Sequence, residues 1–170
     1  CALPIWEGSS GGGGGGGGFG GGNRGPFVIP GEYTVRLTIG DVVTEQTVEV
    51  REDPRNDFDS ELRAEWTETL LDVWGTVGAA QRLSGEVRAV ARRLDAGADR
   101  LDVNDALEDR LRDMERATSE LGSRVSRLYG SIQGWVGPLA ADQEAQRVFL
   151  TDKLDELSQR WEELQGDLPG

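Results

Sequence analysis

The chain has 170 residues, with 31 acidic and 18 basic side chains and a net charge of −13 at pH 7. A negative field argues against binding to nucleic acids and to anionic membrane surfaces. No apolar stretch approaches the roughly 18 residues of a membrane-spanning helix. There is no histidine and one cysteine, Cys1, which removes most nucleophile–base pairs, the commonest metal ligands and any disulfide within the chain.

Residues 1–25 are expected to be a flexible, disordered tether. Residues 11–22 are glycine throughout except for Phe19, and glycine loses more backbone entropy on folding than any other residue. A phosphate-binding loop would open a helix and supply Lys-Ser or Lys-Thr, whereas Asn-Arg-Gly-Pro follows at 23–26. The first five residues resemble the translation of a sequencing adapter and are given no role.

Residues 26–53 are expected to form a β-hairpin. Tyr33, Val35, Leu37 and Ile39 alternate with polar residues, which is the period of a half-buried strand. Gly40 and Asp41 form a tight turn. The apolar residues of the return strand at 42–50 lie mainly on one face, at Val42, Val48 and Val50, and Glu45, Thr47 and Glu49 lie on the other. Because a lone hairpin is marginally stable in water, partner strands are expected upstream in a larger β-domain, and the chain is interpreted as a C-terminal fragment.

The next segment predicts a long helix over about 58–96, which Asp57 or Asp59 can cap. Its apolar or small residues recur in alternating steps of four and three, the spacing of a heptad seam. Three glycines are expected to permit close approach of a neighbouring helix: Gly75, Gly78 and Gly85. The stripe comprises Phe58, Leu62, Trp66, Leu70, Val73, Val77, Ala80, Ser84, Val87, Ala91 and Leu94.

Two further helices are predicted, over about 104–121 and 141–166. Asp102 or Asn104 can cap the first of them, and residues 122–138 are interpreted as mixed, because glycines and a proline interrupt regular structure there. The apolar stripe of the helix over 104–121 comprises Leu107, Leu111, Met114, Ala117 and Leu121. The stripe of the helix over 141–166 and the residues just after it comprises Leu150, Leu154, Leu157, Trp161, Leu164 and Leu168. Val125 and Leu128 could add a helical turn to the first.

These elements predict a mainly α fold. Residues 54–170 should form an elongated antiparallel three-helix bundle, stabilised by burial of the apolar stripes and preceded by the hairpin. Heptad spacing also suits pairing between chains, so a coiled-coil oligomer remains an alternative.

No residue is predicted to be catalytic, to bind a cofactor or to ligate a metal. Glycoside hydrolysis needs two carboxylates flanking a cleft, whereas the acidic residues here lie on polar helix faces. A calcium loop over 99–109 is rejected, because Leu107 stands where that loop requires glycine. Trp66, Trp74 and Trp161 could form a sugar-stacking platform, but the seam positions of Trp66 and Trp161 favour core packing.

The segment 129–138 is the place where a protein-binding site would lie. It contains Tyr129 and Trp135 among three glycines, and an aromatic loop of this kind can form a recognition surface. The preferred interpretation is that both aromatic side chains fold back as a plug over the end of the bundle.

Three parts of the sequence resemble one protein family. Val-Ile-Pro-Gly-Glu-Tyr-Thr-Val-Arg-Leu-Thr at 28–38 is similar to a strand that closes an Ig-like or FlgD-like β-sandwich behind large propeller proteins. Residues 128–143 resemble the loop that enters the last helix of those proteins, and 160–169 resemble their C-terminus. The family is the bacterial BNR/Asp-box, sortilin-like propeller proteins, often labelled glycosyl hydrolase or sialidase-like.

The resemblance implies a non-catalytic C-terminal accessory module of a secreted or periplasmic protein, whose partners are its own upstream propeller and Ig-like domains. The other hypothesis is that the parent is a sialidase-like glycan hydrolase whose catalytic propeller lies outside this sequence. The Asp-boxes of the family do not occur in these residues, so no functional residue carries over.

Overall fold

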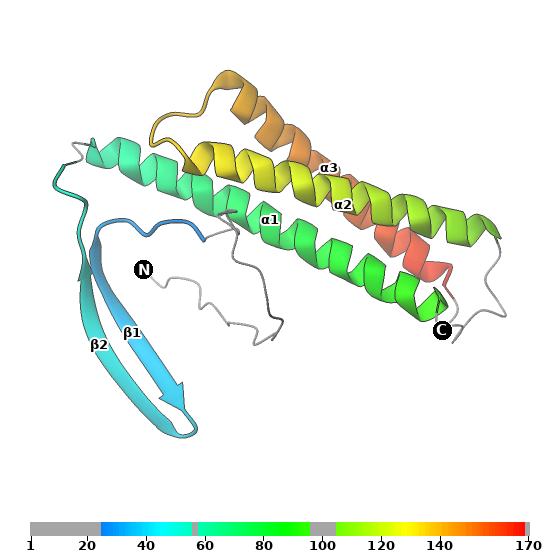
Figure 1. The fold of residues 1–170 in the computed structure, drawn as a ribbon, viewed down its shortest axis with the longest axis horizontal. Coiled ribbons are helices and arrows are strands. Elements are labelled where there is room, and N and C mark those ends of the chain that lie inside the picture. Colours follow the sequence, from blue (N-terminus) through cyan, green and yellow to red (C-terminus); the bar gives the residue numbers. More distant parts are fainter. Residues whose placement is uncertain (1–24, 56–57, 96–104, 169–170) are drawn as a thin grey trace, which may run out of the picture.

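The computed structural model describes residues 25–55, 58–95 and 105–168. Two strands precede three helices in these residues, and the helices run up, down and up beside one another (Figure 1). The elements are β1 (Gly31–Ile39), β2 (Val42–Val50), α1 (Ser60–Asp95), α2 (Asp105–Gln133) and α3 (Ala141–Gly166). The predicted mainly α fold, a three-helix bundle preceded by a β-hairpin, is therefore confirmed.

Some of the predictions fall on parts of the chain that the structure does not describe. The tether expected over 1–25 lies outside the described residues except for Gly25, and so do the candidate helix caps Asp57, Asp102 and Asn104.

The core lies along the axis of the bundle, where the three predicted stripes meet. Each helix packs against both of the others, and Leu70, Val87 and Leu157 are completely buried. Ser84 is buried with the apolar residues, while Ala91, Leu94, Ala117 and Leu168 are partly buried at the margins of the core. The heptad positions therefore fold against one another within a single chain, as the stripe spacing predicted.

The second helix is longer than predicted. The sequence suggested an end near residue 121, but α2 continues to Gln133, through Gly122 and Gly130. Each glycine costs a helix roughly 1 kcal/mol relative to alanine, but burial of four large side chains in the last three turns outweighs that cost. These side chains are Val125, Leu128, Tyr129 and Ile132.

The first helix begins two residues later than predicted, and Asp59 caps it. The carboxylate Oδ1 of Asp59 accepts hydrogen bonds from the backbone N–H groups of Glu61 and Leu62, at 2.9 and 3.1 Å. These bonds satisfy donors that have no partner within the helix. Phe58 therefore lies outside α1 and is partly exposed.

The expectation that α1 glycines admit a neighbouring helix is wrong. A β-carbon at Gly75 or Gly85 would meet no atom within 4 Å, and one at Gly78 would meet only the side chain of Arg82, from the same helix. The interhelical contact in α1 is made by the heptad positions, and Gly75 and Gly85 lie on its exposed side.

The hairpin is regular and antiparallel. Ile39 pairs with Val42, which leaves a two-residue loop in which Gly40 alone has a left-handed φ of 59°. Glycine at the first loop position, followed by a residue with negative φ, is typical of a type II′ turn. Within the part of the chain that the structure describes, neither strand packs against a helix.

Candidate interaction surface

One face of the hairpin is apolar, and it is open to solvent. Residues directly opposite each other in the antiparallel ladder share a face, so the apolar positions of β1 and β2 lie on the same side. Leu37 is 59% exposed and Ile39 is 69% exposed. The exposed large side chains of this face are Val35, Leu37, Ile39, Val42 and Val48.

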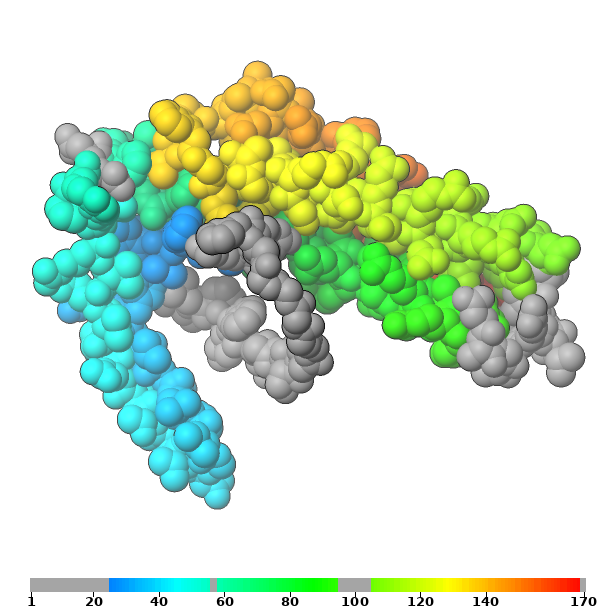
Figure 2. Space-filling model, in the orientation of Figure 1, coloured from blue at the N-terminus to red at the C-terminus, as the bar shows by residue number. Residues whose placement is uncertain are grey.

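The opposite face of the hairpin is mostly polar, although Val43 on this face is also exposed. Arg36 lies directly opposite Glu45, and the two side chains form an exposed ion pair. This division into one apolar and one polar face is the pattern of a sheet that packs on one side against a second layer. Figure 2 shows the hairpin as an arm that projects from one end of the bundle.

The apolar surface continues from the hairpin towards the bundle. Phe27, Val28 and Ile29 lead into β1, and all three side chains are about half exposed. The hydroxyl of Tyr33 donates a hydrogen bond to the carbonyl O of Ile29, which fixes this lead-in segment against the first strand.

A cleft of about 370 Å³ lies where the base of the hairpin meets the end of the bundle. Aromatic side chains form part of its walls, and Glu52 and Arg63 are charged groups in its lining. The guanidinium carbon of Arg63 lies 4.7 Å from the ring centre of Trp66, so a cation–π contact forms part of this lining. The aromatic lining residues are Phe27, Phe58, Trp66 and Trp135.

The segment 129–138 divides into two parts with different roles. Residues 129–133 are the last turn of α2, and Tyr129 is buried against Trp74, with ring centroids 5.0 Å apart. Burial raises the pKa of the Tyr129 phenol, and its oxygen accepts a hydrogen bond from Gln133 Nε2 at 3.0 Å. Tyr129 is therefore buried, as the plug interpretation predicted, but it belongs to α2 and not to a loop that folds back over the bundle.

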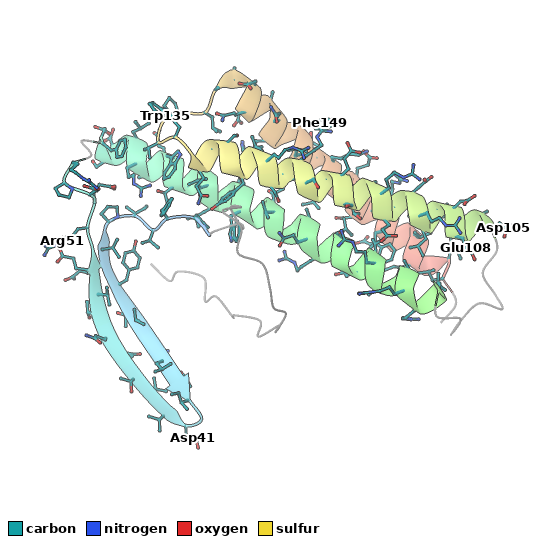
Figure 3. All side chains as sticks on the ribbon, in the orientation of Figure 1. Asp41, Arg51, Asp105, Glu108, Trp135 and Phe149 are labelled. Atoms are coloured by element: carbon teal, nitrogen blue, oxygen red, sulfur yellow. The ribbon has the colours of Figure 1, made fainter. Side chains whose placement is uncertain are left out.

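The plug interpretation is wrong for Trp135, which is 78% exposed in the turn after α2 (Figure 3). The backbone N–H of Trp135 donates to the carbonyl O of Ile132 at 3.4 Å, which orders the turn. A β-carbon at Gly137 would lie 2.8 Å from the indole nitrogen, so glycine at this position lets the ring lie against the backbone. The exposed ring and the cleft make this turn part of the candidate surface.

The three tryptophans weighed as a sugar platform lie in or beside the core. Trp66 and Trp161 are buried, as their seam positions predicted, and Trp74 is partly buried. Each buried indole N–H has a partner: Trp66 donates to the carbonyl O of Ile132 at 3.0 Å, and Trp161 donates to Glu86 at 3.2 Å. These contacts tie the helices together and leave no stacking platform among the three rings.

Many acidic side chains of the helices pair with arginine or lysine. Glu144 accepts two hydrogen bonds from Arg147, which also reaches Asp72 of α1 at 2.8 Å. The guanidinium lowers the pKa of the Glu144 carboxyl, and the ammonium of Lys153 lowers that of Glu156 in the same way. These carboxylates therefore stay ionised, unlike an acid catalyst, whose pKa is raised.

A shallow groove of about 430 Å³ runs between α1 and α2. Small side chains line much of it, including Ser84, Gly85, Ser119 and Gly122. The hydroxyl of Ser84 is buried and has no hydrogen-bond partner among the residues that the structure describes. An unpaired buried hydroxyl lowers stability.

The described ranges, 25–55, 58–95 and 105–168, contain no group of three or more acidic, cysteine or histidine side chains that could hold a metal ion. Of the described helices, none has the length and apolar character needed to cross a membrane. Comparison with known proteins finds no family model, no curated protein and no solved structure that matches this chain.

Proposed function

We propose that this chain is a non-catalytic accessory module from the C-terminal region of a secreted or periplasmic BNR-repeat, sortilin-like propeller protein, of the kind often labelled glycosyl hydrolase. Its role is to make a structural, protein–protein contact. The observation that carries the proposal is the apolar face of the hairpin, which has the alternation of a half-buried sheet and no covering layer among the described residues. The family resemblance at 28–38 falls on this same hairpin.

The partner of the apolar face is the remainder of an Ig-like or FlgD-like β-domain in the same parent protein. Full burial of a valine, leucine or isoleucine side chain contributes roughly 1.5–3 kcal/mol, and side chains such as Leu37 are already partly covered. Covering the five exposed apolar residues of this face would therefore contribute on the order of 5 kcal/mol. The outer edges of β1 and β2 are also unpaired in the described sheet, so strand pairing can add to the contact.

The turn at 134–138 offers a second place for protein contact. Trp135 is a large, exposed and well-oriented side chain, and aromatic residues of this kind contribute strongly to protein interfaces. Because Tyr129 is buried, the partner site expected over 129–138 is reduced to the turn at 134–138.

A photo-crosslinking experiment tests the docking of the hairpin. A benzophenone amino acid is placed at Leu37, on the apolar face, or at Thr38, on the opposite face, in the parent protein. We expect crosslinks from position 37 to the adjoining β-domain and few from position 38. Equal yields from both positions, or none from 37, would contradict the proposal.

The absence of catalysis is tested directly on the chain. The purified protein is incubated with chromogenic glycosides, including sialosides, and product release is followed over a range of substrate concentrations. We expect no saturable turnover. Saturable turnover by this chain would contradict the proposal that it is a non-catalytic module.

A further inference from the structure

Two separate contacts join the hairpin segment to the bundle. On the chain leaving β2, Glu52 Oε2 accepts a hydrogen bond from Arg63 Nε of α1 at 3.0 Å. On the chain entering β1, the carbonyl O of Gly25 accepts a hydrogen bond from Gln133 Nε2 of α2 at 3.4 Å. A single contact would leave the hairpin free to swivel, whereas contacts to two different helices define its direction.

Arg63 is held firmly by the bundle. Its Nη1 donates to Thr67 Oγ1 at 3.2 Å, and its guanidinium lies over the ring of Trp66. Trp66 is itself buried and bonded to Ile132 of α2. Only 11% of the Arg63 side chain is exposed, so its pair with Glu52 is better shielded from solvent than the surface pairs of the helices.

Gln133 is also fixed, through Tyr129. Its side-chain nitrogen donates to the Tyr129 hydroxyl at 3.0 Å, and the ring of Tyr129 is buried against Trp74. The two residues that anchor the hairpin segment, Arg63 and Gln133, are therefore both held in place by side chains of the core. The Gly25 contact is the longer of the two and uses a neutral donor, so the ionic contact of Arg63 is the stronger anchor.

We infer that Arg63 is a positioning residue that locks the hairpin to the bundle, so that the two move as one rigid body. Small rotations at the base would be amplified at the tip, because a strand of nine residues spans roughly 30 Å. The contact between Arg63 and Glu52, called the lock below, therefore determines the direction in which the apolar face of the hairpin points. The inference concerns the isolated chain and stands whether or not that face docks on a neighbouring domain.

Distance measurement between two spin labels tests the lock. The labels are placed on cysteines at Asp41, at the tip of the hairpin, and at Glu108, near the far end of the bundle (Figure 3), in the full chain carrying Cys1→Ser. We expect one narrow distance distribution with Arg63 present. Arg63→Ala should widen the distribution at least twofold, while circular dichroism shows an intact bundle.

Two more variants make the result decisive. Glu52→Ala breaks the same contact from the hairpin side without altering a helix, and it should widen the distribution as Arg63→Ala does. Arg147→Ala is the matched control, because it removes an arginine that joins α3 to Asp72 and lies outside the hairpin contact. It should leave the width unchanged. A broad distribution in the unmodified chain, or a narrow one in both lock variants, would overturn the inference.

Discussion

At the scale of single residues, the polar side chains in and beside the core differ in whether they have hydrogen-bond partners. Thr118 is completely buried, and its hydroxyl donates to the carbonyl O of Met114 at 3.0 Å. Ser84 is buried to a similar degree, but its hydroxyl has no partner within the described part of the chain. The two residues occupy similar places between α1 and α2, so the difference lies in local hydrogen bonding.

Removal of the unpaired hydroxyl should stabilise the protein. Ser84→Ala eliminates a buried polar group and introduces a better helix former, which should raise the free energy of unfolding by about 1 kcal/mol. Urea denaturation measures the change. Ser158→Ala is the control, because the Ser158 hydroxyl donates to Leu154 at 2.8 Å and its loss offsets the gain in helix propensity. An equal gain in both variants would show that propensity alone is responsible.

The Glu144–Arg147 pair should make stability depend on pH. Because the pKa of Glu144 is lowered in the folded state, its contribution is complete above the ordinary glutamate pKa of about 4.3 and is lost as the pH falls through the lower folded value. Glu144→Gln should therefore lower the urea midpoint at pH 7 and have a smaller effect at pH 3. A difference between the proteins that is constant with pH would refute this assignment.

At the scale of elements, heptad spacing predicted which residues are buried better than it predicted where helices end. The α1 stripe from Trp66 to Val87 is buried at every predicted position, because a seam has to face its partners. The end of α2 was missed, since local propensity marks Gly122 and Gly130 as breaks, whereas packing of Tyr129 and its neighbours extends the helix. Propensity is overridden wherever tertiary burial is larger.

The candidate surface was predictable only in part. Alternation in β1 and β2 predicted the apolar face, because the period of two is visible in the sequence. The exposure of Trp135 agrees with the alternative of a recognition surface over 129–138, whereas the contact of Arg63 with Glu52 was not predicted. Trp135 is placed by contacts within its own turn, and the ion pair forms where the chain leaving β2 meets the first turn of α1. The signal in the sequence was the Gly-Trp-x-Gly spacing at 134–137, because the glycine at 137 leaves room for the ring of Trp135.

Glycines in α1 and in the hairpin turn should respond in opposite ways to alanine. Gly85 is exposed and helical with open space around its α-carbon, so Gly85→Ala should raise the free energy of unfolding by about 0.5–1 kcal/mol. Gly40 has a left-handed φ, where a β-carbon costs roughly 1–2 kcal/mol, so Gly40→Ala should weaken the hairpin. Denaturation measures the first effect, and cross-strand nuclear Overhauser effects measure the second. Stabilisation by both substitutions would contradict this reasoning.

At the scale of the whole molecule, the bundle and the hairpin differ in how much of their apolar surface they bury within the chain. The bundle buries its stripes within the chain, whereas the hairpin leaves a face uncovered and is held at its base by Arg63 and Gln133. A lone hairpin of this kind gains little from hydrophobic burial. In the proposed function, the bundle is therefore the support and the hairpin is the surface that meets a partner.

A charge placed on the apolar face tests this account most directly. Leu37→Asp is compared with Thr38→Asp, on the opposite face, both in this chain alone and in the longer protein proposed as its parent, and the melting temperature is measured in each. In this chain neither substitution should lower the melting temperature of the bundle, because both positions are exposed. In the parent, Leu37→Asp should lower the melting temperature of the β-domain by several degrees and Thr38→Asp should not, since only position 37 would place an unpaired charge in an apolar interface. Equal effects of the two substitutions in the parent would contradict the account.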